Sequence, residues 1–213
     1  NDINFLSDRL VVKKNKKDFF VEGILKNKKT SLKNEILKII KLKYNQFNLI
    51  NTNFESVNNF TFKINNKLKV ENLTINSNIL IDNSQYKKND LISNSLLEIN
   101  DLIYLKEHEI NVSYDKNKLL VKGKGKVKLI DKFEFIDYEV TKKGSDFDIV
   151  SNIELSEINI KNQNLIKEYL PNTKEILRLK DHKIKASYTN KKLSIQGKGK
   201  VKLIDKFEFI DYE

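Results

Sequence analysis

One feature limits what this chain can fold into more than any other. The 17-residue string GKGKVKLIDKFEFIDYE occurs twice without a change, at Gly123–Glu139 and Gly197–Glu213. Weaker similarity at the same spacing of 74 residues extends the two copies upstream, to 103–139 and 177–213. Identical sequences fold alike, and repeats of this size are stable when neighbouring units pack on each other. We therefore expect two copies of one supersecondary unit that superpose on each other.

Within each copy, apolar side chains recur at every second position, which is the period of a half-buried β-strand. In the first copy Ile110, Val112 and Tyr114 alternate with polar residues, and Asp115–Lys118 has the composition of a hairpin connection. The residues that follow form one apolar and one lysine row: Leu119, Val121, Val127, Leu129, Phe133 and Phe135 against Lys122, Lys124, Lys126 and Lys128. The pattern predicts a meander of long antiparallel strands with one apolar and one polar face.

The apolar row changes parity after Phe135, because Ile136 and Tyr138 occupy the alternate positions. In a continuous strand such a slip indicates a β-bulge. Lys142–Gly144 then predicts a short hairpin with Gly at the left-handed position. The glycines of each GKGK lie in the apolar row, where we expect them to let the strand bend or another backbone approach closely.

The first hundred residues follow the same pattern more loosely, and two segments break it. Residues 31–41 and 162–170 carry apolar side chains at helical spacing, the first behind a candidate Ser31 cap and the second stopped by Pro171. The predicted fold is mainly β, a long antiparallel meander with two short amphipathic helices packed on it. We divide it into a β-rich segment over 1–100 and the repeated meander over 101–213.

The sequence offers little for catalysis. There is no cysteine, which excludes disulfides, thiolate zinc sites and cysteine nucleophiles. The only histidines, His108 and His182, occupy equivalent repeat positions, where a repeated surface residue is the expected interpretation. GKGK lacks the third glycine of a dinucleotide fingerprint and the ending of a P-loop. We expect no enzyme activity, no metal and no cofactor.

The net charge of +11 raises the question whether the chain binds nucleic acid. Arginine, the residue with the bidentate fork for phosphate, occurs only at Arg9 and Arg178, so the lysines are interpreted as a solvated face and no nucleic-acid partner is expected. The chain has no methionine and stops inside a repeat, which indicates an internal piece of a longer protein.

The succession GKGKVKLIDKFEFIDYEV, FDIVSNIELSEINI, NLIKEYLP and SYTNKKLSIQGKGKVKL resembles the AsmA-like superfamily of bacterial envelope proteins, and is most similar to its large YhdP-type members. The earlier stretches FFVEGILKNKKTSLKNEILKII and FTFKINNKLKVENLTINSNI are also similar to that group. The resemblance implies a curled sheet with a hydrophobic groove along its concave face. It also implies a periplasmic protein, anchored in the inner membrane outside this chain, that carries phospholipid towards the outer membrane.

Under this hypothesis phospholipid is the partner, and the apolar row lines the groove. The candidates are Ile110, Val112, Tyr114, Leu119, Val121, Val127, Leu129, Phe133, Phe135, Phe147, Ile149, Ile153, Leu155, Ile184, Leu193, Ile195, Val201, Leu203, Phe207 and Phe209. For each of them, lining a groove and filling a closed core stay equally open. The second hypothesis is therefore a structural or adhesive cell-surface β-repeat protein with a filled core.

Overall fold

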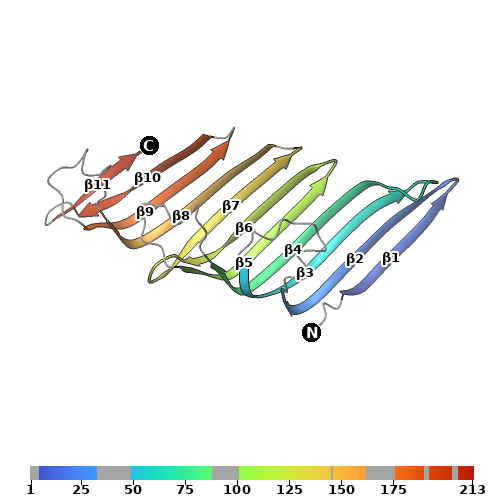
Figure 1. Ribbon diagram of the computed structural model, residues 1–213, viewed down its shortest axis with the longest axis horizontal. Helices are drawn as coiled ribbons and strands as arrows, with labels where there is room; N and C mark the ends of the chain where they lie inside the picture. The colour runs from blue at the N-terminus through green and yellow to red at the C-terminus, as the bar shows by residue number, and fades with distance from the viewer. Residues whose placement is uncertain are drawn as a thin grey trace.

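The computed structural model describes residues 5–32, 49–87, 101–144, 146–161, 176–189, 192–202 and 206–213. These residues form one antiparallel sheet in which each strand pairs with the strands before and after it in the chain (Figure 1). The strands are β1 (Phe5–Asn15), β2 (Asp18–Ser31), β3 (Leu49–Ile64), β4 (Val70–Lys87), β5 (Leu102–Asp115), β6 (Lys118–Lys128), β7 (Phe133–Lys143), β8 (Asp146–Lys161), β9 (Ile176–Thr189), β10 (Lys192–Lys202) and β11 (Phe207–Tyr212). The prediction of a long antiparallel meander is confirmed.

The sheet is an open, single layer with two different long edges. The short connections β1–β2, β3–β4, β5–β6, β7–β8 and β9–β10 all lie along one edge, which we call the hairpin edge (Figure 1). Gly144, in the β7–β8 connection, has φ +62°, which confirms the predicted left-handed glycine. The short 129–132 segment between β6 and β7 lies along the opposite edge.

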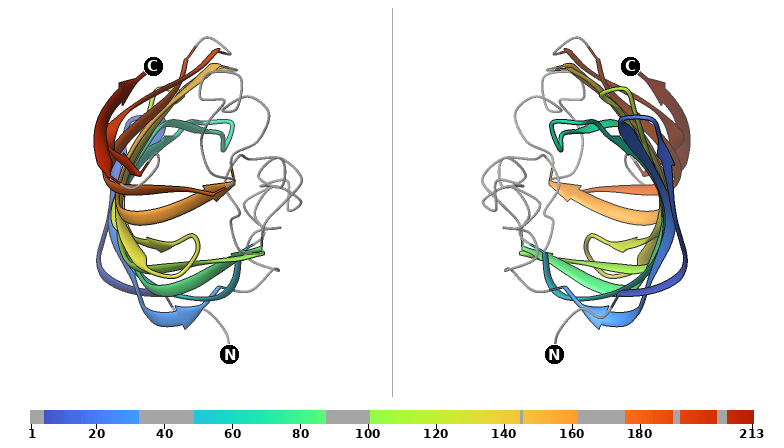
Figure 2. Two further views of the ribbon diagram at one scale, coloured as in Figure 1. Left: turned by 90° about the vertical axis from the view of Figure 1, so that its left-hand side faces the viewer. Right: turned by 90° about the vertical axis from the view of Figure 1, so that its right-hand side faces the viewer.

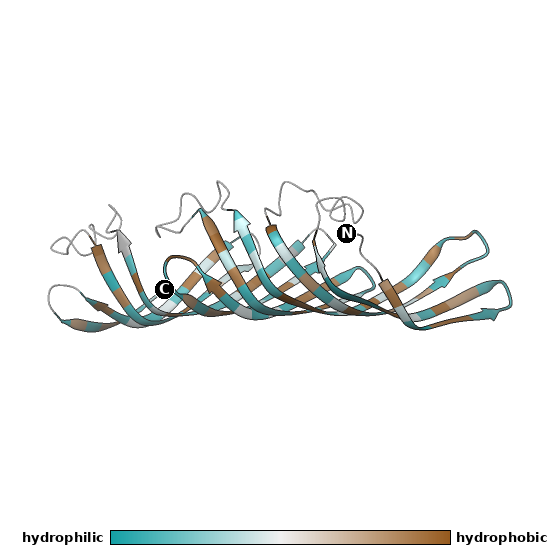
Figure 3. Ribbon diagram, turned by 90° about the horizontal axis from the view of Figure 1, so that it is seen from below, coloured by the Kyte–Doolittle hydropathy of each residue, from teal (hydrophilic) through white to brown (hydrophobic). Residues whose placement is uncertain are grey.

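Seen from its ends, the sheet curls into an open trough (Figure 2), and seen from below its strands bend towards one side (Figure 3). In an antiparallel sheet, residues directly opposite one another on neighbouring strands share a face, so the register assigns each side chain to a side. The buried side chains of the described residues, from Val21 on β2 to Val201 on β10, lie on one side. Since curling brings the side chains of the inner side together, we call it the concave face and the other the outer face.

Two equivalent irregularities keep the apolar side chains on the concave face. Glu107 on β5 and Asp181 on β9 have φ of 54°, and the register of each strand with the next shifts beside them. A residue with positive φ reverses the alternation of side chains along a strand. As a result His108 and Leu105 both lie on the concave face, although they are three positions apart.

The predicted bulge after Phe135 is wrong. The chain leaves β6 at Lys128, reverses direction over 129–132 and returns as β7, which pairs with β6 without a register shift. The apolar residues before and after the change of parity therefore belong to two different strands. The alternation along β6 cannot be continued past Leu129, because the chain turns there.

The predicted helices at 31–41 and 162–170 lie outside the described residues, apart from the start of the first. There Ser31 ends β2, and the backbone N–H of Leu32 donates to the carbonyl of Thr52 at 2.7 Å.

Candidate functional site

The structure places thirteen of the twenty candidate residues on the concave face. They come from five strands, β5, β6, β8, β9 and β10, and are Ile110, Val112, Tyr114, Leu119, Val121, Val127, Ile149, Ile153, Leu155, Ile184, Leu193, Ile195 and Val201. Their side chains are arranged as the period-two pattern of each strand requires. One apolar face of the trough is thus shared by both repeats.

Four candidates were assigned to the wrong face. Phe133 lies opposite Lys128, and Phe135 lies opposite Lys126, so both phenylalanines share the outer face with the lysines. Phe207 and Phe209 repeat this placement on β11. The error follows from treating β6 and β7 as one strand.

Three more candidates lie elsewhere or are not described. Leu129 lies in the β6–β7 connection and packs, partly buried, against the apolar core. The backbone of Phe147 belongs to β8, but its side chain is outside the described part, and Leu203 is outside it altogether.

Burial divides the concave face into two halves. On the half away from the hairpin edge, Leu155, Ile158, Leu177, Leu179 and Val201 form a cluster in which each side chain is between 1% and 6% exposed. On the hairpin half, Val112, Tyr114 and Val121 are only half-buried, and Leu193 is 65% exposed. The first half is a packed core, and the second is an accessible apolar surface.

A histidine and a tyrosine lie over two glycines at the boundary between the halves. His108 Nε2 lies 3.0 Å from the carbonyl oxygen of Lys126, so Nε2 carries the proton and donates it to that carbonyl. A Cβ at Gly125 would lie 2.5 Å from the His108 ring, and one at Gly123 would clash with the Tyr138 ring. Each GKGK glycine therefore makes room for a ring, a role that the expectation of a bend or a backbone approach did not include.

The second repeat reproduces the same unit. His182 Nε2 lies 3.0 Å from the Lys200 carbonyl oxygen, and the His182 and Tyr212 ring centroids are 6.1 Å apart, against 6.3 Å for His108 and Tyr138. The Tyr212 hydroxyl donates to Nδ1 of His182 at 3.4 Å. Both histidines are buried, with exposures of 4% and 1%, so their interpretation as surface residues is wrong.

This burial predicts a pH dependence of stability. Burial lowers the pKa of His108 below its ordinary value of 6.5, so the unfolded chain takes up a proton at higher pH than the folded chain does. The contribution of His108 is complete above about pH 6.5. It is lost as the pH falls through the folded-state pKa, by at most about 1.4 kcal/mol per pH unit.

Urea unfolding between pH 7.5 and 5.5 measures this effect. We expect a falling free energy of unfolding in the wild type and a shallower slope in His108→Gln, whose amide can still donate to the Lys126 carbonyl. Carboxylates such as Glu107, whose pKa is lowered by its bonds to Lys126 and Lys106, titrate in a more acidic range. A wild-type stability that is constant from pH 7.5 to 5.5 would contradict the buried neutral histidine.

The accessible half forms a continuous apolar strip across the strands. One row of directly paired residues runs through Phe60, Ile75, Tyr114 and Leu119. A second row begins beside it on β5 and contains Val112, Val121, Val140, Ile149, Tyr188 and Leu193. We call these two overlapping rows the apolar strip. Spanning β3 to β10 at about 4.8 Å per strand, it is roughly 34 Å long.

The other half of the face becomes polar towards the N-terminus. Asn27, Thr52, Ser56 and Ser84 are buried there. Ser56 donates to Asn27, the Thr52 and Ser84 hydroxyls lie 2.5 Å apart, and Asn58 donates to Ser56 at 2.9 Å. Over β2 to β4, therefore, only the hairpin half offers a continuous apolar surface.

Sequence reasoning missed part of the strip and most of the core. Phe60, Ile75 and Val140 of the strip, and Ile158, Leu177 and Leu179 of the core, were not among the candidate residues. Because side-chain alternation reverses at Asp181, Leu179 and His182 lie on the same face although they are three positions apart. The available signal was an apolar residue both three and five positions before each repeat histidine: Leu105 and Ile103 in the first copy, Leu179 and Leu177 in the second.

On the outer face, lysines pair with acidic residues. Lys122 lies 2.9 Å from Glu139, Lys124 lies 3.0 Å from Glu109, and Lys126 lies 2.6 Å from Glu107. All three are pairs between neighbouring strands, β5 with β6 or β6 with β7. Exposed pairs of this kind contribute about 0–1 kcal/mol each, so this face is solvated rather than a source of stability.

Comparisons with protein-family models, with curated proteins and with solved structures find no match to this chain. Among the described residues there is no helix long and apolar enough to cross a membrane, and no group of three or more potential metal ligands. The fold and the site define a class by themselves: an open, curled, single-layer antiparallel sheet with an accessible apolar strip along its concave face.

Proposed function

We propose that this chain is a segment of a periplasmic protein that binds the acyl chains of phospholipids along the apolar strip and helps to move lipid between the inner and outer membranes. The continuous strip across β3 to β10 is the observation that carries the proposal. The resemblance to AsmA-like proteins supplies the compartment and the inner-membrane anchor.

The energetics of the strip suit this role. Each CH₂ group removed from water contributes about 0.8 kcal/mol, so an exposed acyl chain costs on the order of 10 kcal/mol. Half-buried side chains such as Val112 and Val121 offer apolar surface on which a chain can lie. Because the strip crosses several strands with no charged residue among its members, an acyl chain can slide along it without meeting an unpaired charge.

A structural β-repeat protein is the second candidate, and one observation favours it. The cluster around Leu155 and Val201 shows that half of the concave face is packed as a core. A protein that used the sheet only as scaffold would need this half and would have no use for an accessible strip.

The decisive experiment places the same charge on the two faces of one strand. Leu193, 65% exposed, belongs to the strip, whereas its neighbour Ser194 lies on the outer face. We expect Leu193→Glu to reduce photo-crosslinking to a phosphatidylglycerol with a diazirine-labelled acyl chain by about tenfold. Ser194→Glu should crosslink as the wild type does, and both variants should keep the wild-type melting temperature within a few degrees.

Native mass spectrometry of the purified wild type provides an independent measurement, and bound phospholipid is the expected result. A wild type that neither crosslinks nor carries phospholipid would leave the structural β-repeat protein as the better account. Equal crosslinking of both variants would place the acyl chain away from the strip.

A further inference from the structure

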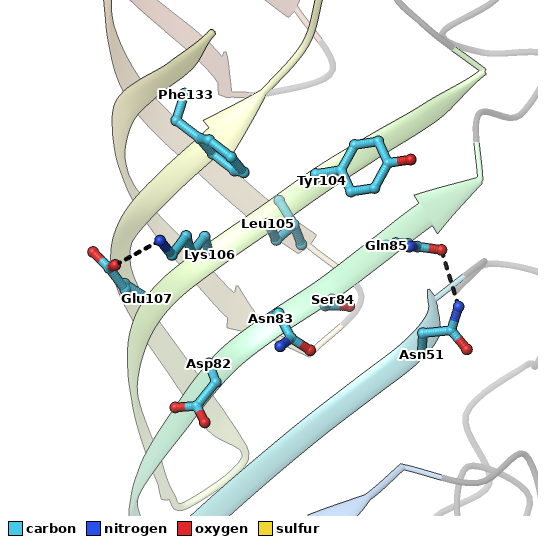
Figure 4. Close-up of a pocket in the computed structure, with 10 residues that line it drawn as sticks. All are labelled: Asn51, Asp82, Asn83, Ser84, Gln85, Tyr104, Leu105, Lys106, Glu107 and Phe133. Atoms are coloured by element: carbon cyan, nitrogen blue, oxygen red, sulfur yellow. Dashed lines mark hydrogen bonds and ion pairs between the residues drawn. The ribbon is translucent and has the colours of Figure 1, made fainter.

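The outer face contains a pocket that the acyl-chain proposal does not use. Its volume is about 400 Å³, within the range of small-molecule sites. Residues of β3, β4, β5 and β7 line it, and Figure 4 shows Tyr104 and Phe133 beside a group of amide and charged side chains.

Two exposed aromatic rings border the pocket. Tyr104 is 36% exposed and Phe133 is 44% exposed. Tyr104 lies opposite Lys128, which in turn lies opposite Phe133, so two strand spacings, about 9.6 Å, separate the two aromatic residues. Flat apolar rings at this separation can each contact the C–H face of a sugar ring in a short saccharide chain.

Uncharged hydrogen-bonding groups lie beside the rings. The Asn51 amide donates to the Gln85 side-chain oxygen at 3.1 Å, and this bond uses neither the Asn51 oxygen nor the Gln85 amide nitrogen (Figure 4). Asn83 adds a third amide to the lining. An amide offers donors and an acceptor at fixed geometry, which suits hydroxyl groups that both donate and accept.

The charged groups of the pocket are all held in ion pairs. Asp82 pairs with Lys29, and Glu107 pairs with both Lys106 at 3.3 Å and Lys126 at 2.6 Å. A phosphate-bearing ligand would have to compete with these carboxylates for the lysines. We propose that the pocket binds a neutral oligosaccharide, through Tyr104 and Phe133 on the ring faces and the three amides on the hydroxyl groups.

The second repeat provides a natural comparison. It keeps Lys180, Asp181 and Phe207 at the positions of Lys106, Glu107 and Phe133, and Lys180 lies 6.0 Å from the Phe207 ring, as Lys106 does from Phe133. Arg178 replaces Tyr104 and pairs with Glu157. The second repeat therefore has one of the two aromatic rings and should not bind the saccharide.

Isothermal titration calorimetry of the full chain with cellohexaose, maltohexaose and chitohexaose tests the proposal. We expect at least one of the three to bind, and Phe133→Ala to weaken that binding at least tenfold. The equivalent change in the second repeat, Phe207→Ala, should leave it unchanged. Tyr104→Arg, which introduces the side chain that the second repeat already accommodates, should weaken binding as Phe133→Ala does.

Side-chain amide signals in ¹⁵N NMR spectra locate the ligand, and those of Asn51, Asn83 and Gln85 should shift on titration. Absence of binding for all three saccharides at millimolar concentration would overturn the proposal. Binding that neither Phe133→Ala nor Tyr104→Arg weakens would overturn it as well, as would preferential binding of oligothymidylate in this pocket. None of these outcomes depends on whether the concave face holds acyl chains.

Discussion

Gly125→Val is expected to lower the free energy of unfolding by about 2–3 kcal/mol, the upper part of the range for overpacked cores. A Cβ at this position would lie 2.5 Å from the ring of His108, which is itself only 4% exposed. The backbone cannot move away, because β6 is paired with β5 on one side and β7 on the other. The ring must leave its place, and the hydrogen bond from its Nε2 to the Lys126 carbonyl is then lost.

Urea denaturation followed by far-UV circular dichroism measures this loss, with Lys124→Val as the matched control. Lys124 immediately precedes Gly125 on the same strand, lies on the outer face and is exposed, so the same valine there should change stability by less than about 0.5 kcal/mol. Removing the ring should relieve the clash, so Gly125→Val should cost much less in a His108→Ala background. A Gly125→Val protein as stable as the wild type would contradict the packing of His108 over Gly125.

The strand pattern could be predicted from the sequence, because the period-two alternation in each repeat depends only on which side of a strand a residue lies. The assignment of Phe133 and Phe135 failed for the same reason. Alternation identifies a face only within one strand, and 129–132, which contains neither glycine nor proline, gave no turn signal where the chain reverses.

The division of the concave face into a core and a strip could not be predicted. Val127 and Val121 belong to the same strand and the same parity, yet the first is buried and the second only half-buried. The difference comes from neighbours distant in sequence and from the reversals at Glu107 and Asp181, where residues with positive φ place additional apolar side chains inside the curl. A glutamate or an aspartate within a strand pattern does not by itself indicate a positive φ.

The sequence repeat places the same packing unit at two positions of the sheet. A histidine and a tyrosine over two glycines recur in both copies, with the positive-φ carboxylate residue directly before the histidine. The ion pair of the lysine that follows the second GKGK glycine also recurs, since Lys126 pairs with Glu107 and Lys200 with Asp181. Each added copy therefore extends the same core and the same strip by the same geometry.

Val201→Glu is expected to unfold the C-terminal part of the sheet, whereas Leu193→Glu should leave it folded. Both residues are on β10 and both lie on the concave face. Val201 is 1% exposed within the cluster that contains Leu155 and Leu179, while Leu193 is 65% exposed on the strip. An unpaired carboxylate in the cluster costs several kcal/mol, a large part of the 5–15 kcal/mol that stabilises a typical domain.

Thermal melting and hydrogen exchange of β9 and β10 amides distinguish the two variants. We expect lost protection in β9 and β10 for Val201→Glu and wild-type protection for Leu193→Glu. Equal destabilisation by both substitutions would mean that the concave face is packed along its whole width, and no surface would then remain on which an acyl chain could lie. Equal tolerance would mean that the Leu155 cluster is not a core, so the curl of the sheet would have to be stabilised by something other than apolar packing on its concave face.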